Sequence, residues 1–321
     1  MNEFSAMGAW SKGVRFFAGR LGQHVTLLIG LGLIVPVGIQ LAARFVLLGS
    51  AFGTPAVMAE PSPIYSFIPI VALASQAGAL FASWRLGVGE GETLGGALRY
   101  GLIAGFVTAL AALLLIALAG LAASQAGSPA LTLFVFLFTV LPVILLLSLL
   151  STVASALIGA AVTVLMTIGM VAGAATGNLG MAATMVGGSG FLVVLLLILG
   201  VLLLWLAARF SCATAIMADS KSYNLIAAAR GSWELTWDEQ WRIMRYLAVL
   251  GIILLVLLVG GLAALGGGAA MLQLSSLGIA QGIGIVFMLA FGLLMLFLAV
   301  MVPAGIYRQM IGERVAADIF A

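Results

Sequence analysis

The charged residues of this chain are confined to a few short clusters, and the long stretches between the clusters carry no charge. No Asp, Glu, Lys or Arg lies between Arg99 and Arg209, and none lies between Arg245 and Arg308. Soluble domains have roughly 25% charged residues, whereas this chain of 321 residues is 7% charged and 64% hydrophobic. Long uncharged apolar stretches of this kind are typical of membrane-spanning segments. A water-soluble fold is therefore excluded.

The apolar runs are long enough for about eight membrane-spanning helices, because a helix needs roughly 20 apolar residues to cross about 30 Å of hydrocarbon. The sequence predicts an all-α fold, a polytopic transmembrane helical bundle accompanied by interfacial amphipathic helices. The expected spans are 25–48, 64–84, 101–123, 131–150, 152–176, 191–208, 247–270 and 279–306. The run from 131 to 176 has no polar turn, so a bundle of six spans is the alternative.

The basic residues determine the predicted orientation, because cytoplasmic loops carry the excess of lysine and arginine. The basic clusters within 12–20, 85–99, 209–245 and 308–314 fall on one side if an even number of spans separates them. Both termini are then cytoplasmic, and the bundle is expected in the inner membrane of a bacterium. The first apolar run lacks a cleavage site of small residues, so we expect it to remain as a signal anchor.

Five segments follow from this topology. They are an N-terminal cytoplasmic amphipathic segment (1–24), a bundle of spans 1–6 (25–217), a cytoplasmic Trp-rich interfacial helix (218–246), a transmembrane hairpin of spans 7 and 8 (247–307) and a cytoplasmic tail (308–321). Arg209 ends the sixth span and is expected to anchor it at the inner interface.

Three tryptophans spaced four residues apart precede the seventh span. A helix would place Trp233, Trp237 and Trp241 on one face, and tryptophan favours the headgroup level of a membrane. We therefore expect an interfacial helix that lies on the membrane, with a docking surface for a partner or an amphipathic ligand as the alternative. The basic residues expected to attract anionic lipid are Arg230, Arg242 and Arg245.

Two local signals refine this predicted helix. Thr236 and Glu239 fit a capping box, so the helix is expected to restart there after a bend at Gly231. Asp238 precedes Arg242 by four residues, a spacing that favours a helical ion pair.

Glycines recur at intervals of four residues in several of the predicted spans. The positions are Gly101 with Gly105, Gly169 with Gly173 and Gly177, and Gly278 with Gly282. Small residues at this spacing let helix backbones approach closely, which is a main route to helix association in lipid. We expect packing within the chain, and self-association into a homo-oligomer or a membrane protein complex is the alternative.

Few polar groups are available for chemistry within the membrane. Gln40, Gln76 and Arg44 are the candidates for a polar pathway. Hydrogen bonds between helices are the ordinary use of the glutamines, and an arginine near the end of a span can extend its charge to the headgroups.

The chain offers little for catalysis, metal binding or a disulfide. Cys212 is the one cysteine and His24 the one histidine, so a His or Cys metal cluster is excluded and no cofactor is expected. We expect His24 to be a plain interfacial residue, and Glu90 and Glu92 to be solvated in a glycine-rich turn. A membrane-embedded lipid enzyme built on these two glutamates or on 234–245 is disfavoured. The net charge of +3 follows from membrane topology and does not indicate nucleic acid.

The stretch from Arg209 to Leu255, with its segment Gly231-Ser232-Trp233-Glu234-Leu235-Thr236, resembles a pattern of bacterial multi-pass proteins. The family is the membrane domain of the glycerophosphoryl diester phosphodiesterase membrane-domain family, including its stand-alone relatives. The resemblance implies an integral inner-membrane protein. It implies no phosphodiesterase activity, since the soluble catalytic domain has no counterpart here and there are no catalytic residues to carry over.

Together these features favour a non-enzymatic integral inner-membrane protein that acts by helix packing. It would be a self-assembling, complex-organising or lipid-associated membrane component. The alternative is a transporter or channel for an apolar or amphipathic substrate.

Overall fold

The computed structural model describes residues 4–48, 68–88, 91–124, 156–161, 190–271 and 277–320. Every regular element in those ranges is a helix, so the predicted helical fold is confirmed for this part of the chain. Within the same ranges, five helical stretches are long and apolar enough to cross a membrane: Leu21–Ile39, Leu94–Ala111, Leu197–Ser220, Gln240–Ala264 and Ile283–Gly312. The total of eight spans stays a prediction, because 131–150 and most of 152–176 lie outside the described residues.

The labelled helices overlap six of the predicted spans, and several extend beyond them, whereas the helix of the predicted span 64–84 begins only at Ile68. In chain order they are α1 (Ala6–Ala18), α2 (Leu21–Val25), the π-helix η1 (Thr26–Ile34), α3 (Val35–Leu48), α4 (Ile68–Val88), α5 (Leu94–Ser124), α9 (Gly190–Phe210), α10 (Ala213–Ser220), α11 (Leu225–Leu235), α12 (Gln240–Met271) and α13 (Leu277–Phe320). No helix breaks at the borders predicted at 217, 246 and 307. A helix satisfies its own backbone hydrogen bonds, so it can leave the hydrocarbon without ending.

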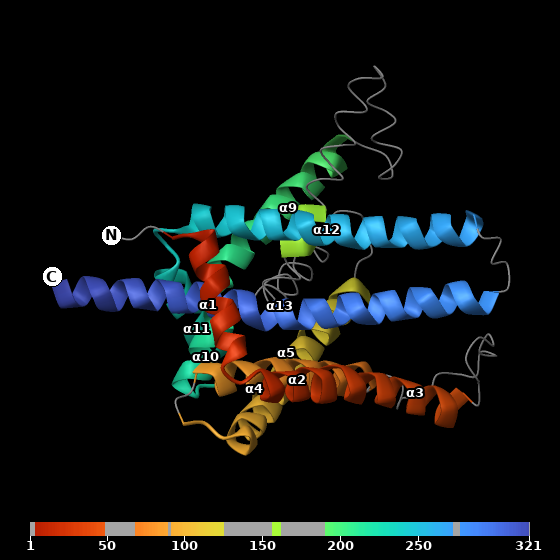
Figure 1. Cartoon of the computed structure of the whole chain (residues 1–321), viewed down its shortest axis with the longest axis horizontal. Helices are drawn as coiled ribbons and strands as arrows, with labels where there is room; N and C mark the ends of the chain where they lie inside the picture. Colours follow the sequence, from red (N-terminus) through yellow and green to blue (C-terminus); the bar gives the residue numbers. More distant parts are fainter. Residues whose placement is uncertain are drawn as a thin grey trace.

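Three short helices form a layer at one end of the long ones. α12 and α13 run side by side along the long axis of the molecule, whereas α1 crosses them at a steep angle (Figure 1). α10 and α11 lie at the same end as α1 and as the C-terminal part of α13 (Figure 1). Ser5 begins α1 by accepting a hydrogen bond from the backbone N–H of Gly8 at 3.3 Å. We call α1, α10 and α11 the end layer.

Two glycines hold α1 against α13. A methyl group on Gly305 would overlap the carbonyl oxygen of Ala9, and one on Gly13 would lie 2.5 Å from the carbonyl oxygen of Met301. The missing side chains let the two backbones approach closely. The end layer is therefore fastened to a long helix by backbone contact.

The same kind of contact joins α4 to α5. A methyl group on Gly105 would lie 2.5 Å from the backbone nitrogen of Gly78 and would overlap the carbonyl oxygen of Ala74. One on Gly101 would lie 2.6 Å from Cβ of Ala82. Gly101 and Gly105 thus lie in a close helix contact within the chain.

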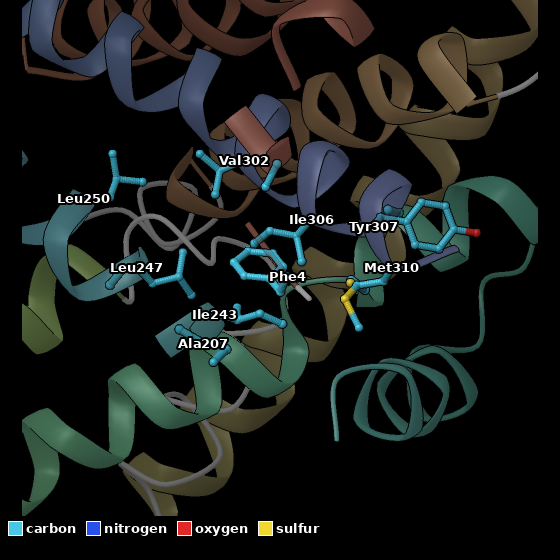
Figure 2. Close-up of a cluster of buried hydrophobic side chains, with 14 of the residues drawn as sticks. Phe4, Ala207, Ile243, Leu247, Leu250, Val302, Ile306, Tyr307 and Met310 are labelled. Atoms are coloured by element: carbon cyan, nitrogen blue, oxygen red, sulfur yellow. The ribbon is translucent and has the colours of Figure 1, made fainter. Parts of the chain in front are cut away.

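One of the buried apolar clusters lies where α9, α12 and α13 meet Phe4, the residue two positions before α1. Figure 2 shows its side chains together, among them Phe4, Ala207, Ile243, Leu247, Leu250, Val302, Ile306, Tyr307 and Met310. The buried indole of Trp84 in α4 donates a hydrogen bond to the carbonyl oxygen of Val300 at 3.2 Å. This bond ties α4 to α13.

Candidate functional site

The tryptophan segment is not one continuous helix. α11 ends at Leu235, the chain turns through Thr236–Glu239, and α12 begins at Gln240. We had expected the three tryptophans to share one helix face, and this expectation is wrong. The bend predicted at Gly231 is also wrong, because Gly231 lies inside α11 and the helix ends at Leu235. The reason is geometric: α11 belongs to the end layer while α12 is a candidate membrane span, and one straight helix cannot follow both directions.

Hydroxyl groups of this segment bind the end of α9. The Ser232 hydroxyl donates a hydrogen bond to the carbonyl oxygen of Arg209 at 2.8 Å and accepts one from the backbone N–H of Cys212 at 3.1 Å. The Thr236 hydroxyl lies 3.2 Å from the same carbonyl oxygen. The last carbonyls of a helix have no partner within the helix. The segment therefore satisfies backbone groups at the point where α9 ends.

The side chain of Arg209 lies against two tryptophans of this segment. Its guanidinium carbon is 4.0 Å from the ring centre of Trp233 and 4.5 Å from that of Trp237. Arg209 is fully buried, and none of its three side-chain nitrogens has a hydrogen-bond partner within the described residues. We call Arg209, Trp233 and Trp237 the Arg209 site.

A buried guanidinium without an acceptor is costly, because the effective penalty for burying an ion is several kcal/mol. Each cation–π contact offsets about 0.5–2 kcal/mol of such a cost. The expectation that Arg209 anchors the sixth span at the inner interface stays a prediction; the structure adds that its side chain is enclosed by protein. The sequence held one signal for the actual environment, namely that the polar segment 231–237 follows α9 closely enough to fold back onto its end.

The rest of the predicted lipid-facing residues lie on or beside the turn. Trp237 and Trp241 are each 57% exposed, whereas Trp233 is half-buried against Trp205 with a ring-centre distance of 5.2 Å. Of the three arginines expected to attract anionic lipid, Arg230 forms an ion pair with Glu234 at 3.1 Å and Arg242 forms one with Glu239 at 3.0 Å. Arg245 is exposed. Arg242 therefore contacts Glu239, three residues earlier, while the predicted helical pair with Asp238 stays a prediction and Asp238 lies in the turn before α12.

A second polar cluster links the end layer to α4. The Glu92 carboxylate accepts hydrogen bonds from Nε and Nη2 of Arg85 at 2.8 and 2.5 Å and lies 3.4 Å from Nζ of Lys221. Arg85 also donates to the carbonyl oxygen of Ala218 in α10 at 2.8 Å. Arg20 donates to the carbonyl oxygen of Glu92 at 2.8 Å. The expectation that Glu92 is simply solvated is wrong.

This cluster predicts how stability depends on pH. The hydrogen bond from Arg85 holds the pKa of Glu92 below its ordinary value. A carboxyl whose pKa is lowered by folding stabilises the fold above its unfolded pKa, about 4.3 for glutamate, and this contribution is lost as the pH falls from there through the lower folded value. We expect the unfolding midpoint of the wild type to drop over that window more steeply than that of Glu92→Gln. Parallel midpoint profiles for the two proteins, measured by circular dichroism in detergent, would contradict this.

His24 is buried, contrary to the expectation of an interfacial residue. Its Nδ1 lies 2.6 Å from the Ser83 hydroxyl, and its ring packs 4.5 Å from that of Phe17 and 5.4 Å from that of Phe16. The histidine therefore joins α2 to α4 and α1. It lies beside apolar rings, which suits a structural role.

The remaining predicted residues are not brought together in the described part of the chain. Gln76 lies exposed on α4, while the surroundings of Gln40, Arg44, Gly278 and Gly282 are outside the description although their helices are within it. Gly169, Gly173, Gly177 and Glu90 lie outside the described residues altogether. Among the described residues, no group of three His, Cys, Asp or Glu side chains could hold a metal ion.

Comparison with protein-family models, with curated proteins and with solved structures finds no match to this chain. The resemblance to the membrane domain of the phosphodiesterase family stays a prediction.

Proposed function

We propose that this protein is a non-enzymatic integral inner-membrane protein that acts by helix packing and associates with lipid through its end layer. One observation carries the proposal: the end layer is fastened firmly to the long helices and still leaves large apolar side chains uncovered. The largest exposures of apolar side chains in the end layer are those of Ile226 at 83% and Met7 at 75%; Trp237 in the turn after α11 and Trp241 at the start of α12 are 57% exposed each. Such side chains on helices at the end of a bundle suit the lipid interface.

The fastening is specific. Besides the glycine contacts of α1, the end of α10 and the loop that follows it are bound from two sides. The Tyr307 hydroxyl donates to the Asp219 carboxylate at 2.7 Å, and the Tyr100 hydroxyl donates to the carbonyl oxygen of Ser222 at 3.0 Å. The layer is thus supported by α13 and α5, which favours a fixed surface over a loosely attached one.

α1 shows the surface most clearly. Its buried face contains Ala9, Gly13, Phe16 and Phe17 and packs on the protein. Met7, Trp10 and Val14, which we call the α1 stripe, lie exposed at helical spacing on another face. Arg15 is exposed beside the stripe. A helix with one apolar face on the protein, a second one uncovered and basic residues at its edge fits a membrane surface.

A label at Met7 tests the proposal. Since Cys212 is the one cysteine of the chain and is buried, a Cys212→Ala background allows Met7→Cys to be labelled with bimane, with Arg15→Cys as the control on the same helix. In vesicles with spin-labelled lipid, we expect at least about twofold stronger quenching at position 7 than at position 15, as for a helix lying in the interface. Equal, water-like emission at both positions would overturn the proposed lipid contact.

A further inference from the structure

We infer that the Arg209 site binds one phosphate group of an anionic lipid headgroup, and that the side chain of Trp237 covers this site when it is empty. The inference rests on the proposed function in one respect, since it places the end of α9 at the level of the headgroups. It starts from the guanidinium of Arg209, which is fully buried and has no acceptor for its N–H groups within the described residues.

The anion has to come from outside the segment. Glu234 and Glu239, the glutamates that flank the site in the sequence, are paired with Arg230 and Arg242. The carbonyl oxygen of Arg209 itself is used by Ser232. The two tryptophans bind the guanidinium through their rings, and this contact leaves the N–H donors in the plane of the guanidinium without acceptors. Two parallel N–H donors fit two oxygens of a phosphate.

The cover over the site is its most exposed part. Trp237 lies in the turn between α11 and α12 and is 57% exposed. Trp205, in contrast, donates a hydrogen bond from its indole to Gln240 at 3.3 Å, and its ring packs on that of Trp233. Displacing Trp237 therefore breaks its contact with Arg209 and leaves the inner wall of the site in place.

Lipid phosphate is the source that this position favours. Arg209 is the first charged residue after the long uncharged stretch 100–208, which places it where a span meets the membrane surface. Anionic headgroups are attracted to Lys and Arg side chains at that surface. A free phosphate ester shares the chemistry, so the experiment has to separate the two sources.

The test uses the full-length protein in dodecyl maltoside micelles and dioleoyl phosphatidylglycerol as the probe. We expect a saturable change in tryptophan fluorescence that Trp237→Phe largely removes and Trp241→Phe preserves, since these two side chains are equally exposed. Arg209→Gln should weaken apparent binding by at least about tenfold, the order of a lost charge-assisted hydrogen bond. Arg230→Gln, at an exposed arginine, should change it by less than about twofold.

A second variant and a soluble phosphate ester complete the test. If Arg209→Gln does not fold, Arg209→Lys keeps the charge but loses the two-pronged geometry, and weaker binding is expected for it as well. Glycerol 3-phosphate without effect assigns the site to lipid, whereas an equal effect overturns the lipid assignment. Unchanged binding in both Arg209 variants, or no saturable change in the wild type, overturns the site. The label at Met7 reports on α1 alone, so failure here leaves the proposed function standing and the two failures can be told apart.

Discussion

Replacing Gly105 by alanine is expected to lower the free energy of unfolding by roughly 1–3 kcal/mol, and replacing it by leucine by more. The added methyl group would overlap the carbonyl oxygen of Ala74 and lie 2.5 Å from the backbone nitrogen of Gly78. Both are backbone atoms, so the strain cannot be relieved by rotating a side chain, and α4 and α5 have to move apart. Titration with sodium dodecyl sulfate in mixed micelles, followed by circular dichroism, measures the change.

Gly95 provides the matched control in the same helix. A methyl group there would have nothing within 4 Å, and alanine is the better helix former by about 1 kcal/mol in a helix interior. Gly95→Ala should therefore be neutral or stabilising. If the two variants unfold at the same detergent concentration, the contact between α4 and α5 does not limit stability.

Replacing Arg85 by methionine is expected to cost about 3–5 kcal/mol, the usual range for removing one partner of a buried ion pair. The side chains of Arg85 and Glu92 are 7% and 13% exposed, and the substitution also removes the hydrogen bond to Ala218. The double variant with Glu92→Gln should lose less than the sum of the two single losses, since it leaves no uncompensated carboxylate. The same detergent titration yields the coupling energy.

The control for this pair lies on the surface of α11. Arg230 and Glu234 are also an ion pair at 3.1 Å, but their side chains are 82% and 61% exposed. Exposed pairs contribute about 0–1 kcal/mol, so the corresponding cycle with Arg230→Gln and Glu234→Gln should show little coupling. Equal coupling in the two cycles would show that burial of the Glu92 cluster does not strengthen it.

The helical fold was predictable from the chain because the requirement is local. The gap in charge before Arg209 and the gap after Arg245 each describe segments whose transfer into lipid depends on their own residues. The close helix contact at Gly101 and Gly105 was also partly predictable, since small residues four positions apart indicate a helix contact. Their partner, Gly78 in α4, could not be predicted, because a single glycine on the facing helix forms no repeating pattern in the sequence.

The candidate site was less predictable. The sequence predicted Trp233 and Trp237 as interfacial residues and Arg209 as an interfacial anchor, but it gave no sign that the Arg209 side chain is buried, and it placed Glu92 in solvent. Both residues depend on distant segments: Arg209 lies against the turn after α11, and the Glu92 carboxylate lies 3.4 Å from Nζ of Lys221, the residue after α10. A periodic pattern can assign residues to one face of a helix, yet it does not report where that helix ends in a turn.

The sequence by itself determined that the chain is a helical membrane protein, because hydropathy and charge act segment by segment and need no knowledge of neighbours. Only the tertiary structure decided which polar groups are buried and what they contact. The guanidinium of Arg209 is enclosed because α11 folds back onto the end of α9, where Ser232 binds the last carbonyl. That contact is made between segments separated along the chain, and its stability comes from complementary shape and hydrogen bonding, which no local pattern records.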